Sequence, residues 1–599
     1  MEMDPLISLL PLALAALVAL LGRKVAKAIK YVALGASLAS LAIIILVALS
    51  GPQGVQSMSW FSVGGFSFSI STSTLPLNML LLAIVGVMTP LIFIYSIGYM
   101  DMLSEQSRFY FEMCVFSAAM MLFAMSANFI TMFIGWELLG ITSYLLIGFW
   151  YGREGTARAA RKAITTIIIG DVMMLFAMFL IWTTFHTFEF ATIIHNASTH
   201  SMYMEIALSM ILVAAFTKSA QFPFSEWLAD AMKGPTPVSA FLHSSTMVKA
   251  GVFLIAVLLP LYVSYNMLYV LLGFGIVTAL IGATNALTEM HIKRILAYST
   301  IEDLGLMFVA LGTGSLIAAM MLFVVQTFYK ALLFMSAGAV IKANGNEEDM
   351  DKVYSSPSFL KLTIPTVLAV ASLAGLFPLS GFFGKAAVDA SAGGSIAVYG
   401  ALLVIGFLSD IYIFRWLFVP MHRRSDKRTA SARARYKMLP AALMAPMYLL
   451  AILIVAGAAA YFLLPTYLSS LGPMNLNIGI TEIAALSIAF AIGLAVSYVL
   501  FYKREYSSIE ERSPIYRVLH SSSAVNAAYY GLAGALLAIA SWMESLDTSA
   551  YGLIRDGGRG LIGLGNRMRK LENGSVNVYA AAFVIGVVAA GALIILVLK

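Results

Sequence analysis

Long apolar runs recur along the whole chain of 599 residues, and they restrict the folds that are open to it. Hydropathy predicts about sixteen runs, each near the roughly 20 residues that a helix needs to cross a bilayer. Inside a bilayer every backbone polar group must be bonded within the protein, so only helices and closed barrels span it. We therefore predict an all-α, polytopic membrane protein. The runs are centred near Ala13, Leu41, Val87, Ala118, Leu139, Leu175, Leu212, Gly251, Thr278, Met307, Val325, Val370, Val404, Leu450, Ile488 and Val587.

Composition excludes an ordinary soluble protein. Hydrophobic residues make up 60% of the chain and charged residues 11%, whereas soluble domains carry about 25% charged residues. Cys114 is the only cysteine, which rules out intrachain disulfides and iron–sulfur clusters held by this chain. The sequence has no haem-attachment motif and no glycine-rich nucleotide loop after a strand. We therefore expect this chain to bind neither a cofactor nor a metal.

Positive charge gathers in three loops, which follow the first, fifth and thirteenth runs. The three loops fall on one side of the membrane if every intervening run crosses it. By the positive-inside rule this side is cytoplasmic, which places both termini outside. The net charge of +7 therefore does not indicate nucleic-acid binding. The basic residues are Arg23, Lys24, Lys27 and Lys30 in the first loop, Arg153, Arg158, Arg161 and Lys162 in the second, and Arg423, Arg424, Lys427, Arg428, Arg433, Arg435 and Lys437 in the third.

The stretch 217–251 sets charges at membrane depth. Lys218, His243 and Lys249 interrupt apolar runs there. An ionisable side chain at this depth costs roughly 2.5–3.5 kcal/mol by insertion scales, so it is expected to face a polar cavity. Prolines beside these charges favour broken helices, as in transporters whose interrupted helices line a site. The stretch therefore predicts a path for protons or ions.

An internal repeat is visible at two pairs of positions. Glu302 follows Glu137 by 302 − 137 = 165 residues, each in a Glu-x-Leu-Gly motif, and Lys385 follows Lys218 by 385 − 218 = 167. Similar spacings suggest two duplicated units of five helices. An odd number of spans inverts the second unit relative to the first, as in many transporters.

Two segments depart from the helical pattern. Residues 51–76 are rich in Gly, Ser and aromatics and indicate an outer loop with possible strand pairing. Residues 507–573 mix charges with apolar periodicity, and about 55 helical residues would reach roughly 80 Å. We expect a long lateral amphipathic helix here that lies along neighbouring subunits. A small soluble subdomain is the alternative.

These observations divide the chain into six parts. They are N-terminal helices and the outer loop (1–105), a first five-helix repeat (106–262), a second repeat (263–420), accessory helices (421–506), the lateral helix (507–573) and a C-terminal anchoring helix (574–599).

Five motifs together resemble the antiporter-like membrane subunits of respiratory complex I, of the chain L type. They lie in order at 135–148, 217–251, 292–300, 328–334 and 381–385. The Pro-Thr-Pro-Val-Ser-Ala core with its downstream His is the most specific of them. The long segment and final span after it look like that subunit's lateral and anchoring helices, so the resemblance covers essentially the whole chain.

The resemblance implies proton translocation through two half-channels joined by a central hydrated axis. It implies that Glu137 and Lys218 form the charge pair of the first half, and that His243 bridges toward the centre. Lys330 is then the central lysine, and Lys385 the terminal lysine at a broken helix.

Four further residues are secondary candidates for the path. Lys249 either conducts or extends its charge to the membrane surface. Asp171 fits polar lining or helix pairing better than a proton stop. Glu302 and Asp303 stand where the family usually has small or amide side chains. Glu302 either provides a carboxylate for the second half-channel or pairs with basic residues near the cytoplasmic end of its helix.

The resemblance also implies the surroundings of the chain. The partners are other membrane subunits of a complex I-like assembly, contacted through the lateral helix, together with lipid and protons. Quinone, flavin and iron–sulfur clusters are expected in partner subunits only. The location is the cell membrane of a prokaryote.

Several positions depart from the family pattern. Gln326 and Leu322 replace histidines that usually precede the central lysine. Ile168 replaces a basic residue, and Ala386 replaces the acid that often follows the terminal lysine. These changes indicate a divergent branch, with an archaeal source and a donor other than NADH as open interpretations.

Two other functions are compatible with the motifs. One is a subunit of a multi-subunit Na⁺/H⁺ antiporter or of a membrane-bound hydrogenase. The length near 600 and the lateral segment favour the complex I-like assembly. The other is a structural clamp without conduction, which the retained Glu137, Lys218, Lys330 and Lys385 argue against.

Overall fold

The computed structural model describes most of the first 503 residues and short pieces of the remainder. The described residues are 4–25, 27–51, 54–63, 66–100, 105–196, 201–354, 360–422, 435–436, 439–471, 478–503, 541, 559–560, 562–563, 566–567 and 576–597. Contacts divide the chain into two units, Met1–Ser523 and Ala524–Lys599, and each is described by itself.

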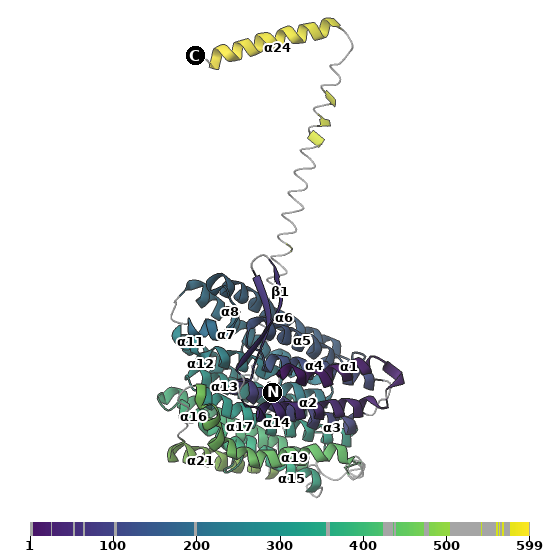
Figure 1. Ribbon diagram of the computed structural model, residues 1–599, viewed down its shortest axis with the longest axis vertical. Coiled ribbons are helices and arrows are strands. Elements are labelled where there is room, and N and C mark those ends of the chain that lie inside the picture. The colour runs from purple at the N-terminus through teal and green to yellow at the C-terminus, as the bar shows by residue number, and fades with distance from the viewer. Residues whose placement is uncertain are drawn as a thin grey trace. The chain divides into compact units, whose positions relative to one another are not determined.

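The first unit is a bundle of helices with one β-hairpin (Figure 1). Its elements, in order, are η1 Pro5–Leu9, α1 Leu10–Ala19, η2 Gly22–Lys24, α2 Ile29–Leu49, β1 Val55–Val63, β2 Phe66–Ser73, α3 Pro76–Tyr99, α4 Gln106–Ala124, α5 Phe129–Ile147, α6 Thr156–Phe185, α7 Phe190–His195, α8 Met202–Lys218, α9 Glu226–Asp230, η3 Ala231–Lys233, α10 Thr236–Ser244, η4 Met247–Lys249, α11 Ala250–Ser264, α12 Leu268–Thr288, α13 Ile292–Gly312, α14 Leu316–Ala343, α15 Leu360–Leu373, α16 Ser380–Ser391, α17 Ile396–His422, α19 Ala441–Ala456, η5 Gly457–Ala459, α20 Ala460–Tyr467, η6 Ser469–Leu471, α21 Ile480–Ser497 and η7 Tyr498–Lys503. In the second unit, α24 spans Val576–Val597.

Twelve helices of the described residues are long and apolar enough to cross a membrane. The chain is therefore a multi-pass membrane protein, but the predicted count of sixteen is not confirmed. The runs centred near Ala13, Leu212 and Val370 fall on α1, α8 and α15, which are shorter than 18 residues, and the run near Val587 falls on α24. The second and third of these are cut short because α8 ends at Lys218 and α15 ends at Leu373.

The predicted strand pairing in the outer loop is confirmed. Strands β1 and β2 form an antiparallel ladder that begins at Val55 opposite Ser73. The loop after β2 is fixed to the bundle, because Ser73 N donates to Met125 O and the Asn78 side chain donates to Ala124 O. The hairpin is the one departure from an all-α chain among the described strands and helices.

Helix α13 lies at the centre of the bundle, with all of its membrane window buried (Figure 1). Close packing of α12 against it depends on glycines. A Cβ atom on Gly282 would lie 2.5 Å from Glu302 N, and one on Gly305 would lie 2.6 Å from Ala279 N. Small residues let membrane helices approach closely. This packing fixes the position of Glu302 in the bundle interior.

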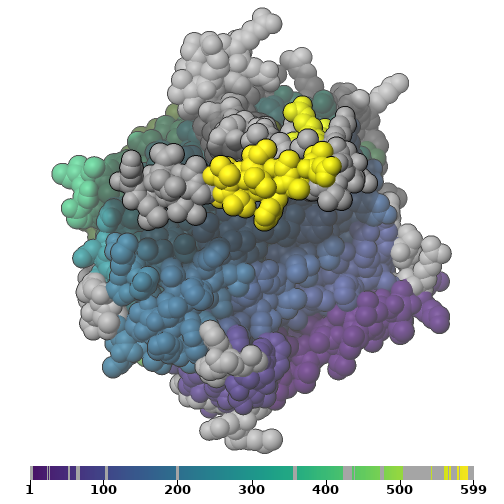
Figure 2. Space-filling view, turned by 90° about the horizontal axis from the view of Figure 1, so that it is seen from above, coloured from purple at the N-terminus to yellow at the C-terminus, as the bar shows by residue number. Residues whose placement is uncertain are grey.

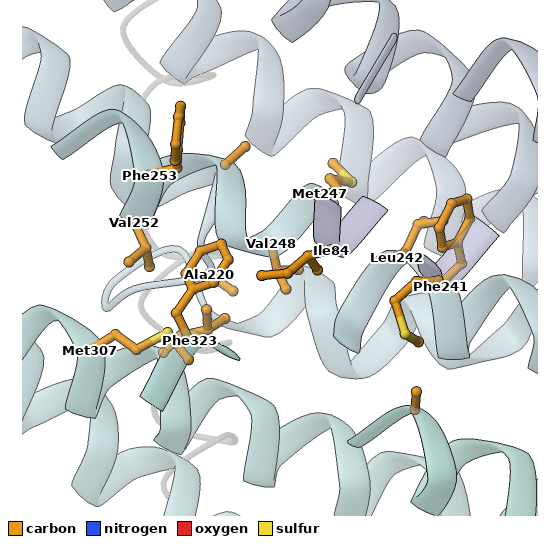
Figure 3. Close-up of a cluster of buried hydrophobic side chains, with 14 of the residues drawn as sticks. Ile84, Ala220, Phe241, Leu242, Met247, Val248, Val252, Phe253, Met307 and Phe323 are labelled. Carbon is orange, nitrogen blue, oxygen red and sulfur yellow. The ribbon is translucent and has the colours of Figure 1, made fainter. Parts of the chain in front are cut away.

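Two helices are interrupted in the middle of the bundle. The first break follows Lys218 at the end of α8, and the second separates α15 from α16. Apolar side chains pack around the first break, among them Ala220, Val248 and Phe323 (Figure 3). The predicted broken helices are therefore present. The inverted relation of two five-helix repeats stays a prediction.

The N-terminal helices form one edge of the first unit (Figure 2). Leu14 and Leu17 of α1 are each 61% exposed, as expected for side chains that face lipid. The predicted lateral helix at 507–573 lies almost entirely outside the described residues. The final predicted span falls on α24, a helix of 22 residues.

Candidate functional site

Buried ionisable side chains run through the first unit. Lys218, Lys249, Lys330 and Glu302 have no exposed surface, and Lys385 is 5% exposed. All of them come from helices at or near the two breaks or from the central α13 and α14. A charge inside a membrane protein is stable only when it is paired or hydrated. Their partners therefore define the site.

Lys218 is held by α5 and α6. Its Nζ donates to Trp136 O at 2.9 Å and lies 3.6 Å from Asp171 Oδ1. Trp136 Nε1 donates to the same carboxylate oxygen at 2.6 Å. Gly140 leaves room for the ammonium group, because a Cβ there would lie 3.3 Å from it. Asp171 therefore contributes directly to the site.

The expected pairing of Glu137 with Lys218 needs correction. Glu137 is only partly buried, and no ion pair within 4.0 Å joins it to a described residue. Asp171 is the direct partner of Lys218 in the structure, and its expected role in polar lining or helix pairing stays a prediction. The rotation of α5 buries Trp136 against Lys218 and leaves Glu137 half-buried, without a direct ion pair to the lysine.

His243 and Lys249 follow in α10 and η4. His243 is buried between the rings of Trp227 and Phe334, with centroids at 6.5 and 6.1 Å. Lys249 Nζ donates to Phe323 O and Thr327 Oγ1 of α14. A lysine bonded in this way does not extend to the membrane surface, so that interpretation of Lys249 is wrong.

Lys330 of α14 pairs with Asp303 of α13. Their Nζ and Oδ2 atoms are 3.1 Å apart, and both side chains are buried. Lys330 also donates to Ser299 Oγ at 2.5 Å, and the Tyr329 hydroxyl donates to Asp303 at 3.1 Å. Asp303, a secondary candidate in the sequence, is thus the counter-charge of the central lysine.

Lys385 of α16 reaches Glu302 through two hydroxyl groups of α17. Its Nζ donates to Ser409 Oγ at 3.0 Å, and Ser409 Oγ donates to the Tyr412 hydroxyl at 3.3 Å. Tyr412 donates to Glu302 Oε2 at 2.6 Å. Glu302 therefore faces the interior and the terminal lysine.

The competing interpretation of Glu302 as a partner of the basic residues Lys293 and Arg294 is wrong. Lys293 binds Glu348 at 2.8 Å, and Arg294 binds Glu289 at 2.8 Å. Burial disfavours the charged form of Glu348, yet Lys293 outweighs this and lowers the pKa of the carboxyl below its usual value. Burial lowers the pKa of His291, which lies 3.6 Å from Glu348. His291 and Glu348 line a cavity of about 290 Å³ at that end of the bundle.

Several buried polar atoms have no hydrogen-bond partner among the described residues. They include Glu302 Oε1, Asp303 Oδ1, His243 Nδ1 and both polar atoms of the Gln326 side chain. Buried polar groups are normally bonded to protein or to ordered water.

Four residues of the site were missed in the sequence. Asp389 and Asp410 are 6% and 3% exposed, and each interrupts an apolar run, which was the available signal. Asp389 lies one turn beyond Lys385 and lines the same small cavity. Ser409 and Tyr412 gave no signal, because such residues are common in membrane helices. No described group of three or more His, Cys, Asp or Glu is placed to hold a metal.

Two family models match the chain. One, described as NADH:quinone oxidoreductase/Mrp antiporter, TM, matches residues 126–411. The other, NADH-Ubiquinone oxidoreductase (complex I), chain 5 N-terminus, matches residues 60–110.

Curated relatives match over most of the length. NADH-quinone oxidoreductase subunit L of Mycobacterium tuberculosis is 32% identical over 570 residues, which are 90% of this chain and 89% of that protein. F(420)H(2) dehydrogenase subunit L of Methanosarcina mazei is 30% identical over 89% of this chain and 88% of that protein. NAD(P)H-quinone oxidoreductase subunit 5 of Paulinella chromatophora is 35% identical over 64% of this chain, and the match spans 60% of that protein.

Solved structures share the fold. A chain of the Mrp complex from Dietzia matches with a TM-score of 0.71 and 23% identity, over 98% of this chain and 63% of that one. A chain of an archaeal membrane-bound sulfane sulfur reductase matches with a TM-score of 0.67 and 18% identity, over 81% of this chain and 97% of that one. Since the subunit L match covers nearly the full length of both proteins, the chain belongs to the NADH:quinone oxidoreductase/Mrp antiporter family of membrane proteins.

Proposed function

We propose that the chain is a proton-translocating membrane subunit of a complex I-like quinone oxidoreductase. One observation carries this proposal: three buried lysines each reach a buried carboxylate, at Lys218, Lys330 and Lys385. Glu137, His243 and Lys249 are proposed to complete the path, although none of them makes an ion pair among the described residues.

The chemistry of the pairs suits proton transfer. Burial disfavours an ammonium ion and a nearby carboxylate favours it, so a change in their separation switches a lysine between holding and releasing a proton. Hydrogen bonds and water then carry the proton to the next pair. Electron transfer takes place in other subunits, where we place quinone, flavin and iron–sulfur clusters.

The assembly is proposed from the relatives. Neighbouring membrane subunits are expected to bind the segment 507–573, and the assembly is expected in the cell membrane of a prokaryote. The three basic loops suggest that both termini lie outside. The electron donor is open, because one relative bears the name of an F(420)H(2) dehydrogenase and others that of an NADH-quinone oxidoreductase.

An antiporter subunit of the Mrp type is the second candidate, since the matching family model includes that group. Sequence identity supports the first candidate. The subunit L relative is 32% identical over 90% of this chain, whereas the matching Mrp chain is 23% identical over 98% of it.

Purification of the native assembly distinguishes the two functions. Copurified subunits with iron–sulfur clusters, and donor-driven acidification of sealed vesicles that a protonophore abolishes, are the expected results. An assembly of small antiporter subunits without redox cofactors would contradict the proposal. So would acidification that needs a sodium gradient.

A further inference from the structure

We propose that Ser409 and Tyr412 of α17 form a hydroxyl relay that carries protons between Lys385 and Glu302. The inference rests on the proposed function, which it deepens by naming the link between the terminal lysine and the interior of the bundle.

The hydrogen bonds of the relay point in one direction. Lys385 donates to Ser409, Ser409 donates to Tyr412, and Tyr412 donates to Glu302. The separations are 3.0, 3.3 and 2.6 Å. The middle distance exceeds the usual O–H···O range of about 2.5–3.0 Å. This is the link that must shorten for transfer.

The relay is enclosed and held in place. Ser409, Tyr412 and Glu302 have no exposed surface. Ser409 and Tyr412 are three residues apart on α17, so they lie on the same face of the helix. The C-terminal half of α17 is anchored, because Trp416 Nε1 donates to Ile292 O at 3.1 Å and Arg415 donates to Glu289 O.

A purely structural tyrosine in this bundle is bonded differently. The hydroxyl groups of Tyr95 and Tyr262 are also buried, and they donate to the backbone carbonyls of Met335 and Leu208. Such a bond satisfies the hydroxyl, but a backbone carbonyl oxygen cannot pass the proton on to another group. Tyr412 instead accepts from one side chain and donates to another, with an ionisable group at each end of the chain of bonds.

Helices α14 and α16 meet at an apolar contact next to Lys385. A Cβ on Gly384 would lie 2.6 Å from Val325 and 3.2 Å from Leu322. The side chains at this contact carry no group that can pass a proton. The path through α17 avoids this contact and reaches Glu302. The next residue, Asp303, forms the ion pair with Lys330.

The transfer balances without a co-reactant. An N–H bond of the Lys385 ammonium breaks as an O–H bond forms on Ser409, and Ser409 passes its own proton to Tyr412. Tyr412 passes its proton to Glu302 Oε2. The result is a neutral amine at Lys385 and a carboxylic acid at Glu302, with both hydroxyl groups intact. Rotation of the two hydroxyl groups resets the chain.

Tyr412→Phe removes the hydroxyl and keeps the ring, so it tests the relay in the purified assembly in sealed vesicles. We expect loss of proton pumping similar to that of Lys385→Ala, with subunit content and quinone reduction retained. Ser409→Ala should also lose pumping, and Ser409→Thr should restore it because threonine keeps the hydroxyl. Tyr262→Phe is the matched control, since it removes a buried tyrosine hydroxyl outside the relay and should pump normally.

The outcomes separate the relay from the proposed function. Normal pumping by Tyr412→Phe, when Lys385→Ala has lost pumping, overturns the relay alone. Normal pumping by Lys385→Ala would overturn the proposed function. If Tyr412→Phe does not assemble, the Ser409 variants decide: equal pumping by Ser409→Ala and Ser409→Thr contradicts the relay.

Discussion

Breaking the central ion pair should destabilise the subunit far more than removing both of its members. Lys330 Nζ and Asp303 Oδ2 are 3.1 Å apart and both side chains are buried. At an effective dielectric constant of about 20, that separation corresponds to an attraction of roughly 5 kcal/mol. Loss of one partner of a buried pair costs roughly 3–5 kcal/mol, because the other charge is left uncompensated.

A double-mutant cycle measures this coupling. Asp303→Asn and Lys330→Met should each lower the free energy of unfolding by up to about 5 kcal/mol, and the upper end requires that the stranded group keeps its charge. The double variant has no stranded charge and should recover most of the loss. Thermal denaturation of the detergent-purified assembly, followed through this subunit, gives the order of stability.

In order of decreasing stability we expect wild type, then the double variant, then the two single variants. Proton pumping should be lost in all three variants. Lys342→Met is the control, because this lysine lies on the same helix and donates to the backbone of Gly98 and Tyr99. Additive losses in the double variant would show that the two groups are not coupled, and the reasoning from the pair would then be refuted.

Four other variants test separate parts of the account. Lys218→Ala and, more weakly, Glu137→Ala should reduce pumping without loss of assembly, because Asp171 is the closer partner of the lysine; normal acidification by both variants would leave these residues with a structural role. Glu302→Gln should reduce pumping in the same vesicle assay, and unchanged pumping would remove this carboxylate from the path. Deletion of 524–570 should release the subunit from its neighbours on native gels, whereas a stable assembly would favour a separate subdomain in this segment.

The buried lysines could be predicted from the sequence alone. Lys218, Lys330 and Lys385 each stand in or beside an apolar run, and the cost of a charge in lipid forces such a side chain inward. For Glu302 the sequence left two interpretations open, with its spacing from Glu137 as support for an interior position. The structure places Glu302 in the interior, at the end of the bonded chain from Lys385.

The partners of these lysines could not be predicted in the same way. Successive residues of a helix point about 100° apart, so sequence position does not decide whether Trp136 or Glu137 faces Lys218. In the structure Trp136 faces Lys218, and the approach of α6 places Asp171 where it contacts both of these residues. Ser409 and Tyr412 carry no charge, and only the packing of α17 against α13 brings them to Glu302.

Hydropathy alone does not show where a helix breaks. The run near Leu212 ends at Lys218, and the run near Val370 ends at Leu373. A hydropathy window averages over such interruptions, so it gives one run where the structure has two helical segments. Lys218 ends the first interrupted helix, and Lys385 lies in α16, after the second break.

The number of protons pumped per electron transferred tests the central claim most directly. In sealed vesicles containing the purified assembly, Lys330→Ala should lower this ratio while quinone reduction continues, and Lys342→Ala should leave it unchanged. An unaltered ratio in Lys330→Ala would contradict the claim that the buried lysines carry protons through this subunit.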